Sequence, residues 1–106
     1  MLLDACSLLS LTANHERLGI GFQAHITADF FDKTELWRVI ENLQRFADLG
    51  LEIHITELDV KCAATASACQ WTAAVSQKQK ETYMQLLEAC LGVDACRTVL
   101  FLITRV

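Results

Sequence analysis

Two acidic side chains lie close together at the end of an apolar, β-branched stretch, residues 51–60. Successive side chains of a strand point to opposite faces, so we expect Glu57 and Asp59 to share a face with Ile53 and Ile55. Carboxylates at the end of an apolar strand are costly to bury without hydrogen bonds, and they mark a reaction or ion-binding site more often than a core. The alternative is a pair of solvated acids. The spacing therefore predicts a carboxylate site.

A second candidate strand, residues 18–26, carries polar side chains toward its own end. Gln23 and His25 are two residues apart and so share a face. A lone histidine on an apolar strand is usually a core residue, but its place beside a strand that bears a glutamate favours a role in the site. His54, on the acidic strand, alternates away from Glu57, and we assign it to the interface between the strand and the helices.

Helices must connect these strands and cover them. Asp32 and Glu35 have the spacing of a capping box, and apolar residues three and four positions apart predict a helix from there to Gly50, its expected C′ residue. Ser76 and Gln79 have the spacing of a second capping box, for a helix whose apolar stripe includes Tyr83 and which ends at Gly92. Each helix has one apolar stripe and therefore one face to bury.

The expected elements alternate between helix and strand along the chain. Residues 2–11 are expected as the end of a helix, 61–75 as a loop and 98–104 as a third buried strand. Near-continuous apolar strands that alternate with helices indicate parallel βα units in an α/β fold. Parallel sheets place their chemistry at the carboxyl ends of the strands, which is where His25 and Glu57 lie.

Size and composition restrict the function further. The 106 residues suffice for one domain with a modest core, and 53% of them are hydrophobic, with no proline. The net charge of −4, without a basic run, argues against nucleic acid as a partner. No apolar run reaches the roughly 20 residues of a membrane-spanning helix, and the apolar N-terminus lacks the basic region of a secretory signal. We expect no membrane partner.

Five cysteines leave at least one thiol outside any intrachain disulfide. Cys90 and Cys96, separated by a short loop after a predicted helix, are the favoured pair. Cys62 and Cys69 could close a second loop and leave Cys6 single, and the alternative is that these are small buried apolar side chains. A disulfide would indicate an oxidising compartment. The sequence has no spacing typical of a metal site, so we expect no metal and no other cofactor.

Two motifs together resemble one enzyme family. Residues 18–25 read Leu-Gly-Ile-Gly-Phe-Gln-Ala-His, and residues 55–60 read Ile-Thr-Glu-Leu-Asp-Val. In this order they resemble glycoside hydrolase family 10, the retaining endo-1,4-β-xylanases, and the resemblance extends over residues 18–104. It implies a partial TIM (β/α)8 barrel of about the last three βα units with parallel strands. Residues 1–106 would then be the C-terminal portion of the catalytic domain.

The resemblance also implies a role for each polar side chain of the two strands. Glu57 would be the nucleophile that attacks the anomeric carbon of the sugar. His25 would hydrogen-bond Glu57, and Asp59 would hold His25. Because hydrogen bonds to a carboxylate favour its charged form, this network suits a nucleophile. Gln23 would line the sugar site.

Aromatic residues and the missing acid complete the comparison with the family. Trp71, in the loop after the acidic strand, is a candidate for contact with a sugar, whereas Trp37 is expected to pack. Residues 101–105, Phe-Leu-Ile-Thr-Arg, stand where the family usually has Trp-Gly-Ile-Thr-Asp. A retaining glycosidase needs a second carboxylic acid. The family carries it on a Trp-Asp-Val-Val-Asn-Glu-type motif, which this sequence does not contain.

The sequence therefore predicts a C-terminal fragment of a secreted, retaining endo-1,4-β-xylanase. The expected partners are xylan or xylo-oligosaccharides and the missing N-terminal half of the barrel. We expect the isolated chain to be inactive, because it lacks the acid, and to self-associate through unpaired sheet edges. The alternative is a degenerate barrel remnant without catalysis, or a carbohydrate-binding piece.

Overall fold

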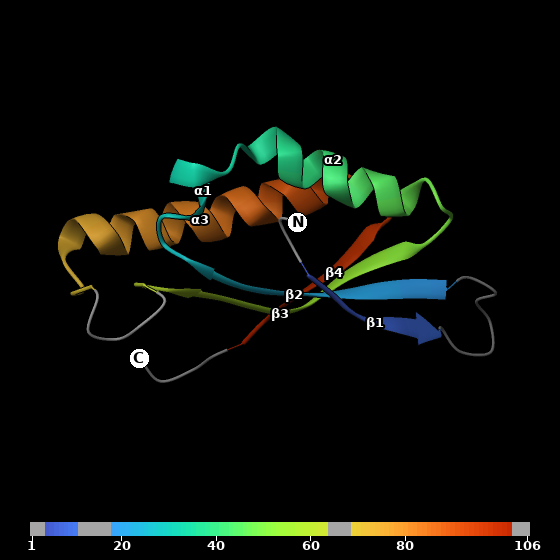
Figure 1. The fold of residues 1–106 in the computed structure, drawn as a ribbon, viewed down its shortest axis with the longest axis horizontal. Coiled ribbons are helices and arrows are strands. Elements are labelled where there is room, and N and C mark those ends of the chain that lie inside the picture. The colour runs from blue at the N-terminus through green and yellow to red at the C-terminus, as the bar shows by residue number, and fades with distance from the viewer. Residues whose placement is uncertain (1–3, 11–17, 64–68, 103–106) are drawn as a thin grey trace.

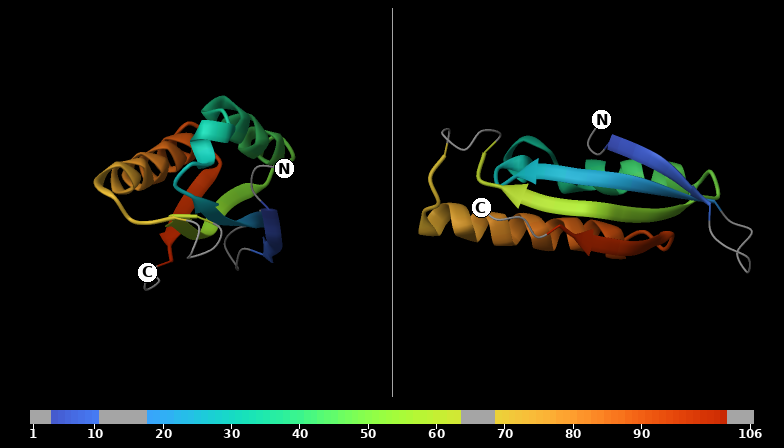
Figure 2. Two further views of the ribbon diagram at one scale, coloured as in Figure 1. Left: turned by 60° about the vertical axis from the view of Figure 1, so that its left-hand side comes forward. Right: turned by 90° about the horizontal axis from the view of Figure 1, so that it is seen from below.

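The structure is a computed structural model that describes residues 4–10, 18–63 and 69–102. One four-stranded sheet is covered on one face by helices, and its other face is open in the described part of the chain (Figures 1 and 2). The strands, in their order across the sheet, are β1 (Asp4–Ser10), β2 (Leu18–Thr27), β3 (Glu52–Lys61) and β4 (Cys96–Phe101). The helices are α1 (Phe30–Lys33), α2 (Leu36–Ala47) and α3 (Ala73–Leu91).

Strands β2, β3 and β4 are parallel, which confirms the predicted βα order for this part of the chain. The prediction of a helix over residues 2–11 is wrong where the structure describes them, because Asp4–Ser10 forms strand β1, antiparallel to β2. A short apolar segment has no decisive period of its own. Here Asp4–Ser10 pairs with the backbone groups at the edge of β2, and this pairing favours a strand over a helix.

A β-bulge at Thr56 shifts the phase of strand β3. Phe22 pairs with Ile55 but the next residue, Gln23, pairs with Glu57, so Thr56 is the extra residue. The Thr56 hydroxyl donates to the carbonyl of Phe22, 3.2 Å away. Since a bulge interrupts strict alternation, the predicted shared face of Glu57 with Ile53 and Ile55 is wrong. The β3 side chains packed under the helices belong to Ile53, Ile55, Leu58 and Val60.

His54 lies on the open face of the sheet and not at the helix interface that we expected. It pairs with Gly21, whose neighbours in β2 are core residues, and this places it on the same face as Glu57 and Asp59. Its Nδ1 lies 2.9 Å from Thr98 Oγ1. The bulge is again the reason, because the alternation was counted across it.

Helices α2 and α3 bury their apolar stripes against the sheet. The largest fully buried side chains are Phe22, Leu43, Ile53, Ile55, Leu58, Leu86, Val39 and Val93. At about 1.5–3 kcal/mol for each large apolar side chain removed from water, this layer supplies most of the driving force for folding. The core therefore fixes β2 and β3 from the helix side and leaves their other face to polar residues.

The helix ends differ from those predicted, mostly at the N-termini. The capping box at Glu35 does not form, because Glu35 makes no side-chain cap bond, and α2 begins at Leu36. Helix α3 begins three residues before Ser76, since the Thr72 hydroxyl accepts from the Val75 amide at 3.2 Å. Its end at Gly92 is confirmed.

Gly50 follows α2 as predicted but two residues beyond the C-cap, Asp48. Its φ of 84° is one that glycine adopts without strain. The third predicted strand, β4, begins two residues earlier than residue 98. The expectation that it is buried is wrong, because β4 lies at the edge of the described sheet and its residues are half-buried or exposed.

Two disulfides close short loops. The favoured pair, Cys90 and Cys96, is bonded with its Cα atoms 5.3 Å apart. The second candidate pair, Cys62 and Cys69, is also bonded, at 5.8 Å between Cα atoms. The side chain of Cys6 lies outside the described part of the chain. The disulfides are compatible with an oxidising compartment.

Candidate functional site

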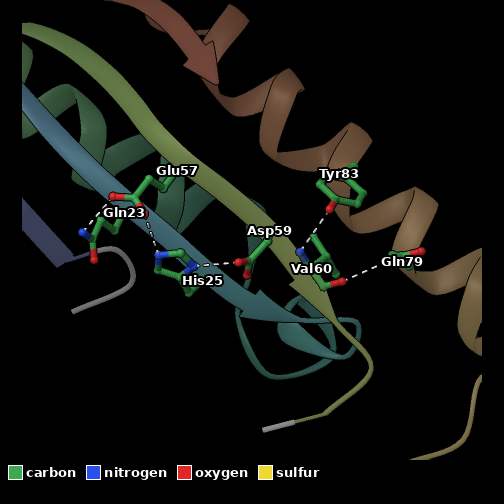
Figure 3. Close-up of polar contacts among 7 residues, drawn as sticks. All are labelled: Gln23, His25, Glu57, Asp59, Val60, Gln79 and Tyr83. Atoms are coloured by element: carbon green, nitrogen blue, oxygen red, sulfur yellow. Dashed lines mark hydrogen bonds and ion pairs between the residues drawn. The ribbon is translucent and has the colours of Figure 1, made fainter. Parts of the chain in front are cut away.

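Four polar side chains meet on the open face at the carboxyl ends of β2 and β3 (Figure 3). Gln23 and His25 come from β2, and Glu57 and Asp59 from β3. Gln23 pairs with Glu57 and His25 pairs with Asp59 across the two parallel strands, so that residues paired in the sheet are also joined through their side chains. The phase change at the bulge is what brings both acids to this face.

The four side chains form one continuous chain of polar contacts. Gln23 Nε2 donates to Glu57 Oε2 at 3.0 Å. His25 Nε2 lies 3.5 Å from the other oxygen, Oε1, of Glu57. On its opposite side the imidazole places Nδ1 2.8 Å from Asp59 Oδ2. One oxygen of Glu57 therefore accepts a hydrogen bond from Gln23, and the other faces His25 at a longer distance.

The histidine stands between two carboxylates, and this determines what it can donate. An ionised carboxylate only accepts hydrogen bonds, and a neutral imidazole has a single N–H group. Only the doubly protonated ring of His25 can donate to Glu57 and Asp59 at the same time. A neutral ring of His25 donates to one of the two carboxylates, and its tautomer decides which one.

Burial distinguishes the two acids. Asp59 is only 4% exposed, whereas the side chain of Glu57 is 40% exposed. A buried, hydrogen-bonded carboxylate suits the support of another group, and an accessible one can meet a substrate. The geometry therefore permits nucleophilic or general-base chemistry at Glu57, with Asp59 in support.

The tryptophans lie outside this group. Trp71 is the residue before Thr72, the N-cap of α3, and is 38% exposed. It makes none of the polar contacts described for the four side chains, and its contact with substrate stays a prediction. Trp37 was expected to pack, which is wrong: it is 53% exposed, because it lies on the outer side of α2, where the Arg38 guanidinium stacks over its ring at 4.8 Å.

Another acid lies in the loop after β2. The pKa of the Asp29 carboxyl is held below its ordinary value of 3.8 by a hydrogen bond from the Thr27 hydroxyl and by Lys33, whose Nζ is 3.2 Å away. On the neighbouring helix, hydrogen bonding to Asp32 raises the pKa of Lys78. These ion pairs belong to the exposed surface of the loop and helix and not to the four-residue group.

Sequence reasoning missed two residues of α3 that contact the end of β3. Gln79 was expected in a capping box and Tyr83 in the apolar stripe. Instead both bond the backbone of Val60, the residue after Asp59 (Figure 3). Their spacing of four residues, which puts them on one side of a helix, is the signal that could have linked them.

Comparisons with known proteins agree with the site's motifs. The sequence profile of glycosyl hydrolase family 10 matches residues 12–102. The chain is 35% identical over 78 residues to endo-1,4-beta-xylanase 5 of Pyricularia oryzae, covering 74% of this chain and 18% of that protein.

Two further relatives match over a similar stretch. Endo-1,4-beta-xylanase of Agaricus bisporus is 35% identical over 78 residues, covering 74% of this chain and 21% of that protein. Endo-1,4-beta-xylanase B of Thermotoga neapolitana is 37% identical over 83 residues, covering 78% and 22%. The chain thus spans about a fifth of the length of the curated relatives it matches. No solved structure matches it significantly.

Proposed function

The chain belongs to glycosyl hydrolase family 10, and from this premise we propose that it supplies the nucleophile-bearing part of a retaining endo-1,4-β-xylanase. The observation that supports the proposal most is the contact chain from Gln23 through Glu57 and His25 to Asp59. It holds one accessible carboxylate in a fixed orientation at the carboxyl end of a parallel strand, where (β/α)8 enzymes carry their chemistry.

In the proposed reaction Glu57 forms a bond from one carboxylate oxygen to the anomeric carbon of a xylose unit. The glycosidic C–O bond breaks as a second carboxylic acid protonates the departing oxygen, and water later releases the sugar from Glu57. The two carboxyl groups of a retaining enzyme lie about 5 Å apart. The second acid is the part that the proposal assigns to the preceding barrel strands, because the sequence lacks its motif.

Gln23 and His25 orient the nucleophile in this proposal. Each holds one of the two oxygens of Glu57, which restricts rotation of the carboxylate before the sugar arrives. When one oxygen attacks, negative charge leaves the Glu57 carboxylate, and the hydrogen bond from the amide to the other oxygen persists. Gln23 also lies at the rim of the site, where it would contact the sugar.

The substrate class follows from the relatives, which are named endo-1,4-beta-xylanases. We assign xylan or xylo-oligosaccharides to the complete barrel and a secreted location to the enzyme, with which both disulfides agree. The isolated chain should not hydrolyse xylan, since loss of leaving-group protonation typically costs roughly 10²–10⁴-fold.

A chimera tests the proposal. Residues 18–102 of this chain replace the corresponding segment of the Thermotoga neapolitana enzyme, and release of reducing sugar from xylan is measured. We expect the chimera to be active and its Glu57→Gln variant to be inactive. Glu41→Gln, which alters an exposed acid of α2, is the matched control and should keep activity.

A covalent label identifies the attacking atom independently. A 2-fluoro xylobioside with an activated leaving group should add its sugar mass to Glu57, because such a leaving group departs without protonation. A folded chimera that binds xylan but neither hydrolyses it nor takes the label would overturn the proposal and favour a non-catalytic remnant or a carbohydrate-binding piece.

A further inference from the structure

Beyond Leu58, strand β3 is bonded on one side by helix α3, and the described residues of β4 do not pair with it there. The last bond between β3 and the β4 side in the described chain joins the Leu102 amide to the Leu58 carbonyl at 2.9 Å. Alternate residues of a strand direct their backbone groups to the same neighbour. Val60, two residues beyond Leu58, therefore presents its N–H and C=O groups on the side where β4 pairing stops.

Two side chains of α3 occupy these backbone positions. The Val60 amide donates to the Tyr83 hydroxyl at 3.2 Å, and Gln79 Nε2 donates to the Val60 carbonyl at 2.9 Å (Figure 3). Side chains four residues apart lie next to each other on one side of a helix. Gln79 and Tyr83 can therefore reach the C=O and N–H groups of a single strand residue at the same time. The pair thus completes the hydrogen bonding that a further strand residue would otherwise supply.

Neighbouring contacts fix this pair in place. The ring of Tyr83 packs against Phe101 at the end of β4, with ring centroids 5.6 Å apart. Thr82, which lies between Gln79 and Tyr83 in α3, is 2% exposed. Its hydroxyl donates to the carbonyl of Ala28, just after β2, at 3.0 Å. One helix therefore bonds the carboxyl ends of both strands that carry the four polar side chains.

We propose that Gln79 and Tyr83 are positioning residues for the site, acting through Val60 on Asp59. Asp59 is buried and has one described bond, to His25; its other oxygen, Oδ1, has no hydrogen-bond partner within the described residues. The placement of this carboxylate therefore depends on the backbone beside it. When the Val60 backbone is released from α3, only the pairing with β2 still holds this end of β3. Asp59 then shifts relative to His25, and His25 loses its fixed orientation toward Glu57.

The catalytic meaning of this role rests on the proposed function, but its test does not use activity. The full 106-residue chain is compared with its Tyr83→Phe and Gln79→Met variants, which keep the ring and the chain length and remove the bonding atoms. Gln77→Met is the matched control, because the amide of Gln77 bonds only exposed Glu81 one turn along α3.

Two readouts by mass spectrometry are residue-specific. Amide hydrogen exchange should speed up at Val60 by roughly 10-fold in Tyr83→Phe, the effect of losing one net hydrogen bond, and stay unchanged at buried Ile55. Acylation of imidazole by diethyl pyrocarbonate should speed up at His25 and not at His54, which lies on the same face at the other end of β3. The control variant should change neither rate.

Three results would overturn the proposal. Equal acceleration at Ile55 and Val60 would mean that the substitutions lower overall stability. Faster exchange at Val60 with an unchanged rate at His25 would mean that the contact is structural only, and no change at either residue would mean that it has no effect. If the Glu57→Gln chimera stays active while both rates rise as expected, the proposed function fails and the positioning role stands.

Discussion

Replacement of Asp59 by asparagine isolates the charge of the buried acid from its shape. In the parent chain His25 Nδ1 lies 2.8 Å from the Asp59 carboxylate. The variant keeps the side-chain volume, and its amide oxygen can still accept a hydrogen bond from His25 Nδ1. What is lost is the charge. A hydrogen bond to a charged group contributes about 1.5–3 kcal/mol, but the side chain of His25 is 36% exposed, so solvent screens part of this interaction. We discount the effect to about 1–2 kcal/mol.

This energy should appear in catalysis and not in folding. A loss of about 1.4 kcal/mol in orienting His25 lowers kcat/KM about 10-fold. The assay is xylan hydrolysis by the chimera that carries Asp59→Asn, with urea unfolding of the same protein. Stability should change little, because the desolvation cost of the buried carboxylate is removed together with its partner interaction.

The matched control for this experiment is Asp48→Asn, which alters an exposed acid at the end of α2 that accepts from Gln44. It should leave both activity and stability within error of the parent protein. An Asp59→Asn chimera with unchanged kcat/KM would refute the reasoning, because the charge of Asp59 would then contribute nothing to the orientation of His25.

Further predictions concern stability and assembly. Gly19→Ala should destabilise the fold by about 1 kcal/mol in thermal unfolding, because the new Cβ would lie 3.2 Å from the ring of His54, which its contact with Thr98 keeps from moving away. Because the pKa of Asp29 is lower in the folded protein than its ordinary value of 3.8, this carboxyl stabilises the fold above pH 3.8. The stabilisation is lost as the pH falls through the folded-state pKa. An acid titration of stability should show a smaller loss in Thr27→Val, which lacks the hydroxyl that bonds the carboxyl. Replacement of Cys90 and Cys96 by alanine, which removes the disulfide between α3 and β4 and leaves the other one, should cost roughly 2 kcal/mol in urea unfolding, and equal stability of this variant and the parent chain would contradict this. Size-exclusion chromatography should show self-association of the isolated chain, and a compact monomer would contradict it.

Strands β2 and β3 and the place of Gln23, His25 and Glu57 could be predicted because they depend on local pattern. Apolar runs bounded by polar residues mark the strands, and parallel topology puts their carboxyl ends together. The motifs then identify the family without any need for packing detail. The position of these three side chains near the strand ends is therefore readable from the sequence, and their roles stay predictions.

The parts that could not be predicted depend on neighbours. The bulge at Thr56 exists only relative to the register with β2, so the face of His54 could not be counted from β3 alone. The bonds from Gln79 and Tyr83 to Val60 depend on how α3 packs beside the end of β3. Such features result from tertiary contacts, which a periodic pattern does not contain.

The antiparallel strand β1 has a consequence for the rate at which a barrel could be assembled. Asp4–Ser10 lies before the family-matched residues 12–102, and it occupies the edge of β2 to which a preceding parallel strand of a (β/α)8 barrel would pair. Joining an N-terminal barrel fragment to this chain would therefore be an exchange of strands and not a simple addition. Its observed rate should rise with fragment concentration only until release of β1 becomes limiting, and then reach a plateau that deletion of residues 1–10 removes.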